Sequence, residues 1–365
     1  MQHDSAVSLS LSHSLGRPAW PFEADRYEQM SRFLHSASDI CLLGHVNPDG
    51  DAVGSVTGFC SALRSAFPGK NIRMVVPNEI PRIVAELPLA DEIISYRLPN
   101  GSLDKRAEDA ILQANLICCL DFQSPKRLGP FLSPFLIQAQ APKVLIDHHL
   151  DPMPDFFALS LSYPPLSSTA ELVYHTLIGM GMQAHVTADV AQSLLCGIIT
   201  DTGCFAYQTK ETSVFHVAAD LIERGADKEQ LMDRIYHRNT VGQIKLRGYV
   251  LSEKLHIYPE IGAAYFSLSK EEMSRFGVID SETEGLVNEA LSIDGINYSF
   301  YIRRRNSELK ISLRSTGAHS VNDVASKLFN GGGHTNAAGA EYPDPNGVEE
   351  VARMILDEIR NRENK

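Results

Sequence analysis

The 365-residue sequence lacks several features that would place it in common protein classes. No run of about 18 apolar residues occurs, so we expect no helix that crosses a membrane. The six cysteines show no CxxC or other metal-knuckle spacing and lie mostly in apolar segments, which predicts reduced thiols in a cytoplasmic protein. No GxSxG segment marks a serine nucleophile.

An excess of positive charge is also missing. The formal net charge is -12, which excludes the broad basic face that proteins use to coat long nucleic acid. A short anionic substrate that is held locally stays compatible with this charge. The first residues have scattered serines and no basic stretch before an apolar core, which predicts a flexible leader over residues 1–24 rather than a signal peptide.

Short apolar segments alternate with helical patterns in the first two thirds of the chain. These segments are apolar throughout, which is typical of parallel strands covered on both faces. The alternation predicts an α/β domain built on a parallel sheet. The predicted strands are 39–45, 71–77, 92–96, 115–121 and 143–149, and the predicted helices include 50–67, 168–181, 187–203 and 212–227.

The pattern changes near residue 254 to strands of alternating polarity. This change predicts a second, smaller α+β domain with a mostly antiparallel sheet and helices at 281–291, 321–329 and 346–361. A helical linker is expected to join the two domains. The predicted boundaries are 25–238 for the first domain, 239–254 for the linker and 255–365 for the second domain.

Polar residues end three of the predicted parallel strands. The carboxyl ends of parallel strands meet at one edge of the sheet, where open α/β sheets bind their ligands. Taken singly, Asp49 or Asp51 could instead cap a helix, and Asp201 could begin a turn. The polar residues at these positions are His45, Asp49, Asp51, Asp121, Asp147, His148 and His149, and Asp201 follows an apolar helical segment.

Carboxylates that gather at one edge of a sheet repel one another unless a cation compensates their charge. Asp49, Asp51, Asp121 and Asp201 together match the charge of two divalent cations. Two metals ~3.5 to 4 Å apart can hold a hydroxide as nucleophile and polarise a phosphoryl oxygen. Carboxylate and imidazole ligands without thiolate favour Mn²⁺ over Mg²⁺, Co²⁺ or Zn²⁺. The sequence therefore predicts a two-metal site for phosphoester hydrolysis.

The segments "GHVNPDGDAVGS", "CLD", "LIDHH" and "DTG", in this order, resemble the motifs of the DHH phosphoesterase family. The "SLRS" and "GGGHTNAAGA" segments resemble the DHH-associated C-terminal domain. The resemblance extends from about residue 25 to the end of the chain. Within the family, the chain is most similar to the compact branch of nano-RNases (oligoribonucleases) and 3'-phosphoadenosine 5'-phosphate phosphatases.

The resemblance implies two metal ions and a division of the ligands between them. Asp121 bridges both ions. The first ion takes His45 and Asp49, and the second takes Asp51, His148 and Asp201.

The resemblance also implies residues that act on the substrate. His149 faces the substrate phosphate as a donor or acid, and Asp147 orients a neighbouring histidine and sets its tautomer. In the second domain, Arg314 holds a phosphate or carboxylate and His334 donates to an anion. A flexible turn is the alternative for the three glycines whose backbone N–H groups would approach that anion, which are Gly331, Gly332 and Gly333.

The implied function is a cytoplasmic, metal-dependent phosphoesterase. It would release nucleoside 5'-monophosphates from very short single-stranded RNA and would also dephosphorylate 3'-phosphoadenosine 5'-phosphate, without long duplex or membrane partners. A homodimer is left open. The alternatives are an inorganic pyrophosphatase or exopolyphosphatase, a linear or cyclic dinucleotide phosphodiesterase, and a non-enzymatic nucleotide sensor. The sensor is disfavoured because all six ligand positions are filled.

Two further segments receive structural roles. Ser168, Thr169 and Glu171 begin a predicted helix, so capping is their default role, with contact of Ser168 or Thr169 to the site as the alternative. The "RRR" run at 303–305 is expected to be mainly a solvated face.

Overall fold

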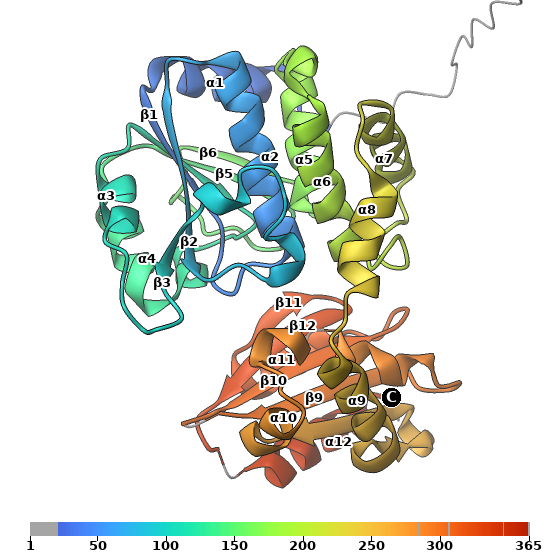
Figure 1. Ribbon diagram of the computed structural model, residues 1–365. Coiled ribbons are helices and arrows are strands. Elements are labelled where there is room, and N and C mark those ends of the chain that lie inside the picture. Colours follow the sequence, from blue (N-terminus) through green and yellow to red (C-terminus); the bar gives the residue numbers. More distant parts are fainter. Residues whose placement is uncertain (1–20, 284, 306, 346, 364–365) are drawn as a thin grey trace, which may run out of the picture. The chain divides into compact units, whose positions relative to one another are not determined.

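The computed structural model describes residues 21–283, 285–305, 307–345 and 347–363 (Figure 1). The chain divides into two compact units, one that extends to residue 148 and includes 152–228, and one that comprises 149–151 and 229–365. Most of the predicted leader, residues 1–24, lies outside the described residues. None of the helices in the described ranges has the length and apolar character needed to cross a membrane.

A six-stranded parallel sheet forms the centre of the first unit. Its strand order is β3-β2-β1-β4-β5-β6, and every neighbouring pair is parallel. The five predicted apolar strands are present, whereas β6 was missed because its four residues alternate between buried and half-buried positions. The strands are β1 (Asp39–Leu43), β2 (Asn71–Asn78), β3 (Ile94–Arg97), β4 (Leu116–Leu120), β5 (Lys143–Asp147) and β6 (Leu159–Ser162).

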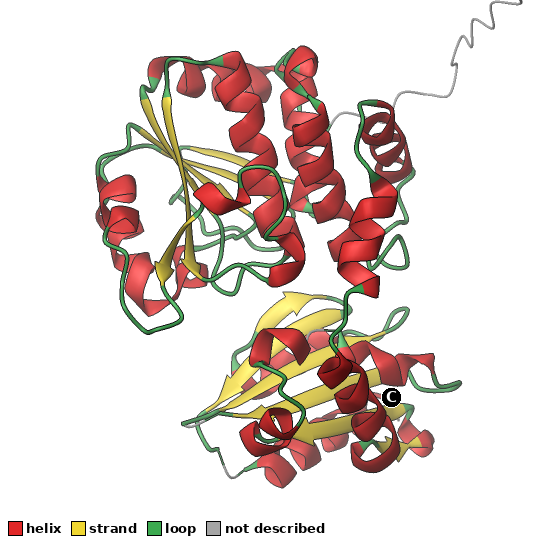
Figure 2. Cartoon of the chain, in the orientation of Figure 1, coloured by secondary structure: helices red, strands yellow, loops and turns green. Residues whose placement is uncertain are grey.

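Helices cover both faces of this sheet, which explains why its strands are apolar throughout (Figures 1 and 2). On one face, Leu43, Cys119 and Leu145 of the strands share a buried cluster with Ile111 of α3 and Leu132 of α4. The other face is covered by α2, α5 and α6. The helices of this unit are α1 (Ala24–Ser36), α2 (Gly50–Ala66), α3 (Arg106–Leu112), α4 (Gly129–Gln138), α5 (Thr169–Gly179), α6 (Ala188–Asp201) and α7 (Ser213–Glu223).

The strand order reverses direction between β1 and β4. β2 and β3 extend the sheet on one side of this pair, and β5 and β6 extend it on the other. Leu43 pairs with Cys119 and Leu120 pairs with Ile146, so β1, β4 and β5 end at one edge. Such a reversal opens a crevice beyond the carboxyl ends of the strands.

Glycines bring α2 and α6 into close contact near this edge. A Cβ atom on Gly54 would lie 2.4 Å from the backbone oxygen of Ser193, and one on Gly197 would lie 2.9 Å from a carboxylate oxygen of Asp51. The close approach places the last residue of α6, Asp201, beside the start of α2.

The second unit contains a six-stranded sheet in the order β11-β12-β10-β9-β8-β7. Only β8 and β9 are parallel among the neighbouring pairs of the described sheet, so the predicted α/β and α+β fold class is confirmed. Leu313, Phe300 and Ile311 on one face pack against Val324 of α11 and Ile355 of α12. The strands are β7 (His256–Tyr258), β8 (Ala263–Leu268), β9 (Tyr298–Arg304), β10 (Leu309–Ser315), β11 (Gly332–His334) and β12 (Ala337–Tyr342).

The helices between and after these strands differ in one place from the prediction. The segment expected as one helix at 281–291 forms two short 3-10 helices, Asp280–Thr283 and Leu286–Ser292, because Gly285 adopts a left-handed conformation between them (φ 84°). The remaining helices are α8 (Lys228–Met232), α9 (Val241–Tyr249), α10 (Lys270–Arg275), α11 (Val321–Phe329) and α12 (Val348–Glu363).

The arginine run at the end of β9 is a solvated face only in part, since Arg304 is exposed and Arg303 is not. Arg303 is buried and forms an ion pair with Asp280 at 3.4 Å. Arg305 pairs with Glu308 at 3.3 Å. These ion pairs lie within the second unit and tie its loops to the sheet.

The α2–α6 contact predicts that Gly54→Ala destabilises the fold. The added Cβ must push against the backbone of α6, and overpacking of this kind costs ~1–3 kcal/mol of the free energy of unfolding. Chemical denaturation followed by circular dichroism measures the loss. The matched control is Gly69→Ala, where an added Cβ meets no atom within 4 Å, and equal stability of the two variants would contradict the prediction.

Candidate metal centre

The edge of the first sheet gathers six of the residues that the sequence singled out. His45 follows β1, Asp49 and Asp51 begin α2, Asp121 follows β4, His148 follows β5 and Asp201 ends α6. His45, Asp51, Asp121 and His148 are each at most 4% exposed. The cluster consequently contains four carboxylates and two imidazoles, most of them shielded from water.

The cluster consists of two groups that share Asp121. In the first group, His45 Nε2 lies 3.2 Å from Asp121 Oδ2 and 3.7 Å from Asp49 Oδ2. In the second group, His148 Nε2 lies 3.8 Å from both Asp121 Oδ1 and Asp51 Oδ2. Asp201 Oδ2 joins this second group at 3.5 Å from the same nitrogen. Each oxygen of Asp121 thus faces a different group.

Backbone carbonyl groups define which nitrogen of each histidine faces the carboxylates. His45 Nδ1 lies 2.9 Å from the oxygen of Val46, and His148 Nδ1 lies 3.2 Å from the oxygen of Leu166. A carbonyl oxygen only accepts hydrogen bonds, so each Nδ1 carries the proton. The Nε2 atoms face the carboxylates, and each can offer a lone pair to a metal ion once it carries no proton.

The charges of the cluster shift the pKa values of its members in the absence of a cation. Burial raises the pKa of Asp51 well above its usual range, and the carboxylates of Asp121, Asp201 and Asp49 raise it further. Burial lowers the pKa of His45, but its hydrogen bonds to Asp121 and Asp49 outweigh this effect and raise the pKa to about 10. The cluster therefore retains a proton when no metal ion is bound.

A divalent cation fits this set of donors. Two ligand atoms bound at ~2.1 Å to one ion and separated by 90° to 110° lie roughly 3.0 to 3.4 Å apart. The nitrogen-to-oxygen distances of 3.2 to 3.8 Å in both groups are close to this spacing and longer than charged hydrogen bonds. Donors of oxygen and imidazole nitrogen suit Mn²⁺ or Mg²⁺ more than a thiophilic ion.

Residues around the cluster hold the acidic side chains in place. Asp49 is the N-cap of α2, and its Oδ1 accepts hydrogen bonds from the backbone N–H groups of Asp51 (3.1 Å) and Ala52 (3.0 Å). The capping alternative and the cluster position are thus both realised in one side chain. Asp121 has φ 65°, a left-handed conformation that is costly for a residue with a Cβ and is concentrated at functional sites.

The sequence did not assign Thr169 to the site, although contact with it was an alternative. Thr169 Oγ1 donates to Asp121 Oδ1 at 2.9 Å, and the backbone N–H groups of Thr169 and Ala170 donate to Asp51 at 2.7 and 2.8 Å. Ser168 is the N-cap of α5. The residue types of Ser168 and Thr169 predict only the start of a helix. The contacts of Thr169 with Asp51 and Asp121 could therefore not be found without the fold.

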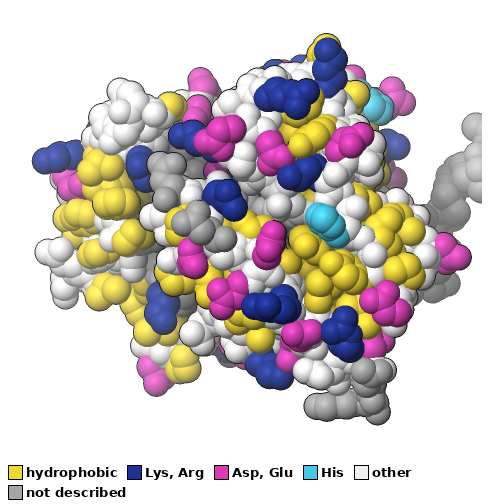
Figure 3. All heavy atoms as spheres, turned by 90° about the horizontal axis from the view of Figure 1, so that it is seen from below, with side chains coloured by type: hydrophobic (Ala, Val, Ile, Leu, Met, Phe, Trp, Pro, Cys, Tyr) yellow, Lys and Arg dark blue, Asp and Glu magenta, His cyan; other side chains and the backbone are white. Residues whose placement is uncertain are grey.

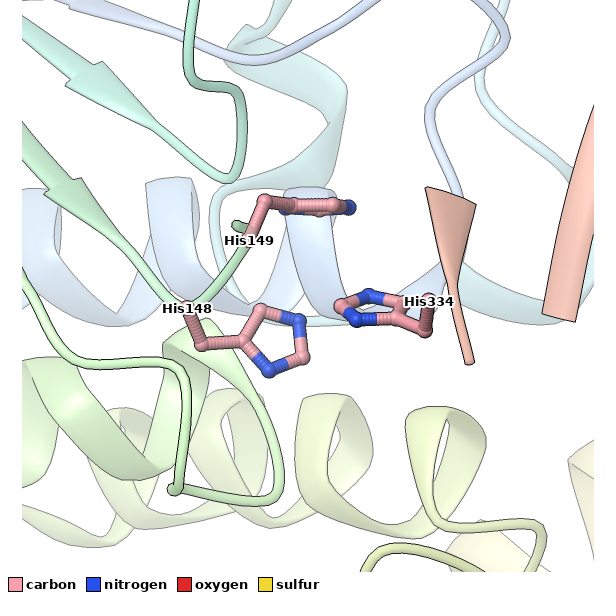
Figure 4. Close-up of side chains that lie close together, drawn as sticks. All are labelled: His148, His149 and His334. Atoms are coloured by element: carbon pink, nitrogen blue, oxygen red, sulfur yellow. The ribbon is translucent and has the colours of Figure 1, made fainter. Parts of the chain in front are cut away.

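The two predicted catalytic residues, Asp147 and His149, flank His148 at the end of β5. Asp147 is the last residue of β5 and is fully buried. His149 is half-buried and comes directly after His148 (Figure 4). Their predicted roles in catalysis stay predictions.

The predicted substrate-binding residues Arg314 and His334 lie on β10 and β11, the two strands that flank β12. Ala337 of β12 pairs with Arg314 of β10 on one side and with His334 of β11 on the other. Cross-strand partners point to the same face, so Arg314 and His334 flank a small residue on one face of the sheet.

The three glycines near His334 differ in what constrains them. A Cβ on Gly331 would lie 2.4 Å from the oxygen of Gly339, and one on Gly333 would lie 2.3 Å from the oxygen of Ala337. These two glycines allow the hairpin to close. Gly332 has no such contact, since the nearest atom to an added Cβ, apart from those of the adjacent residues, would be Asn322 Oδ1 at 3.9 Å.

The raised pKa of His45 predicts that divalent cations displace a proton. Near pH 7.5 the metal-free cluster holds this proton, and a cation that binds Nε2 must release it, so we expect about one proton per chain. Titration with Mn²⁺ in weak buffer measures the release. His45→Gln should release fewer protons, and the exposed His216→Gln should match the parent. Uptake of Mn²⁺ without proton release would contradict the raised pKa.

Two family models match the chain. The DHH family, N-terminal domain, matches residues 39–198, and the DHHA1 domain matches residues 262–361. A bifunctional oligoribonuclease and PAP phosphatase NrnA from Thermus thermophilus is 32% identical over 322 residues, which cover 88% of this chain and 89% of the relative. The protein of the same name from Bacillus subtilis is 28% identical, with 90% and 96% covered.

Solved structures show the same fold. The crystal structure of an exopolyphosphatase-related protein from Bacteroides fragilis has a TM-score of 0.84 and 33% identity, and the match covers 93% of this chain and 96% of that chain. RecJ from Thermus thermophilus in complex with Mn²⁺ has a TM-score of 0.54 at 13% identity, with 93% of this chain and 54% of RecJ covered, and supports the fold alone. The resemblance drawn from the motifs is thereby confirmed, and the chain belongs to the DHH family with a DHHA1 domain after its DHH domain.

Proposed function

We propose that the chain is a two-metal phosphoesterase that hydrolyses very short RNA to nucleoside 5'-monophosphates and also dephosphorylates 3'-phosphoadenosine 5'-phosphate. The observation that carries the proposal is that two groups of carboxylate and imidazole side chains share Asp121. Relatives that cover nearly the whole chain bear the name of a bifunctional oligoribonuclease and PAP phosphatase, which supports the same substrates.

In this proposal each group of the cluster holds one divalent cation, preferably Mn²⁺. Two bound cations supply Lewis-acid polarisation of the phosphoryl group and lower the pKa of an attacking water. Asp121 is shared between the cations. His45 and Asp49 complete the first site, and Asp51, His148 and Asp201 complete the second.

His149 and Asp147 act on the substrate side of this cluster. The half-buried imidazole of His149 is placed after a metal-site histidine, where it can donate a hydrogen bond or a proton to a phosphate oxygen. The buried carboxylate of Asp147 orients a neighbouring histidine and selects its tautomer.

The second unit would bind the remainder of the substrate. Arg314 and His334 flank Ala337 on one sheet face and supply a fixed cation and a donor for an anion. Gly332 leaves its backbone N–H open to close approach. On the face drawn in Figure 3, Lys and Arg side chains are interspersed with Asp and Glu, so this face carries no continuous basic patch for a long nucleic acid.

Hydrolysis of inorganic pyrophosphate or polyphosphate is the second candidate. Polyphosphate hydrolysis is favoured by the 33% identical protein that is described as exopolyphosphatase-related. The two candidates share the metal chemistry and differ in what the second unit holds, so a comparison of substrates separates them.

A reducing compartment agrees with the thiols of the chain. None of the six cysteines, all of which lie in the described ranges, forms a disulfide, and five of them are buried. Free, buried thiols are typical of proteins in the cytoplasm, where we propose that the enzyme acts.

Sedimentation of the full chain distinguishes a monomer from the homodimer that the sequence left open.

A substrate panel with Mn²⁺ tests the proposed function. RNA of two to five nucleotides and 3'-phosphoadenosine 5'-phosphate should be hydrolysed, in preference to pyrophosphate, polyphosphate and cyclic dinucleotides. Asp121→Asn should lower kcat roughly 10³-fold, because the metals supply several kcal/mol of charge stabilisation. The exposed Asp109→Asn is the control, and turnover of pyrophosphate or polyphosphate alone would overturn the proposal.

The sheet face of the second unit predicts a separate effect on substrate binding. Arg314→Ala should raise KM for RNA about tenfold or more, since a charged hydrogen bond is worth ~1.5–3 kcal/mol. Gly332→Ala should raise KM without loss of stability, because its Cβ meets no close neighbour. The matched control is Arg304→Ala, because Arg304 is an exposed arginine of β9 that does not pair with Arg314, Ala337 or His334. An equal KM for all variants would contradict the assignment.

A further inference from the structure

The start of α5 donates hydrogen bonds to two carboxylates of the cluster. The first N–H groups of a helix have no partner within the helix. Those of Thr169 and Ala170 donate to the two oxygens of Asp51 at 2.7 and 2.8 Å. The hydroxyl of Thr169 donates to Asp121 Oδ1 at 2.9 Å. Thr169 is fully buried, so these contacts are shielded from water.

The contact with Asp121 falls on the carboxylate that both groups share. Its Oδ2 lies 3.2 Å from His45 Nε2, and its Oδ1 lies 3.8 Å from His148 Nε2. Rotation of the carboxylate about its terminal bond would turn both oxygens away from these directions, and terminal carboxylate torsions are broad. The bond from Thr169 to one oxygen opposes that rotation.

The turn before Thr169 is fixed by hydrogen bonds to a buried carboxylate, that of Glu171. Glu171 is fully buried, and its Oε2 accepts hydrogen bonds from the backbone N–H (2.9 Å) and the hydroxyl (2.7 Å) of Ser167. The hydroxyl of Ser213 on α7 donates to its Oε1. In turn, Ser168 Oγ accepts from the N–H of Glu171 at 3.1 Å. Thr169 thus has little freedom to follow a moving carboxylate.

We infer that Thr169 is a positioning residue whose hydroxyl holds the Asp121 carboxylate in the orientation that lets two cations share it. The inference rests on the proposed function, because it assumes that the cluster binds metal. It gives a defined role to a side chain for which helix capping was the default expectation and contact with the site the alternative.

Burial alone does not explain the contact of Thr169. Thr176 lies on the same helix and is equally buried, and its Oγ1 has no hydrogen-bond partner among the described residues. A buried threonine hydroxyl is therefore tolerated in α5 without a partner. The same substitution at the two positions separates a role in the site from a role in helix packing.

Thr169→Val removes the hydroxyl, keeps the side-chain volume and preserves the backbone N–H that binds Asp51. We expect the affinity for the second Mn²⁺ to fall about 10- to 100-fold, as for other residues that orient metal ligands. The spin-coupled signal of two bridged Mn²⁺ ions in electron paramagnetic resonance should give way to the signal of isolated ions. Thr169→Ser should restore both, and Thr176→Val should match the parent.

Calorimetric titration and resonance spectra of the full chain with Mn²⁺ separate the outcomes. If the parent binds no Mn²⁺, the proposed function fails. If the parent binds two coupled ions and Thr169→Val does the same with equal affinity, the inference is overturned. Should Thr169→Val not fold, as judged by circular dichroism, Thr169→Ala takes its place. Equal losses in Thr169→Ser and Thr169→Val would also overturn the inference.

Discussion

Repulsion between four carboxylates gathered at one edge of the sheet is the constraint on which the structure of the first unit depends. Two helix starts act against this repulsion, since the N-terminal end of a helix carries partial positive charge. The N–H groups at the start of α2 bind Asp49, and those at the start of α5 bind Asp51. The imidazoles of His45 and His148 lie between the acids. These contacts offset part of the negative charge, and a cation or a proton offsets more.

The same constraint explains the packing of small residues behind the cluster. α6 can deliver Asp201 only if its backbone approaches α2 closely, and Gly54 and Gly197 permit this approach. A glycine inside a helix costs ~0.5–1 kcal/mol relative to alanine. The cost is accepted where the position of a carboxylate depends on it.

The sequence predicted the sheet and the location of the cluster because both follow from patterns along the chain. Strands buried on both faces are apolar throughout, and their polar ends must meet at one edge. The rest depends on contacts between distant segments. Neither the hydroxyl of Thr169 against Asp121 nor the burial of Arg303 beside Asp280 has a local signal. β6 was missed because four alternating residues give too short a pattern, and the helix expected at 281–291 was interrupted by the left-handed Gly285.

The cluster draws its members from strand ends and helices that are spread from His45 to Asp201. Contacts between residues so far apart in sequence form late, because the entropy of closing the intervening loops must be offset first. During synthesis, no ribosome-bound fragment that ends before α6 can hold the complete cluster. Capture of a cation by the finished cluster would therefore report that the first unit has reached its native topology.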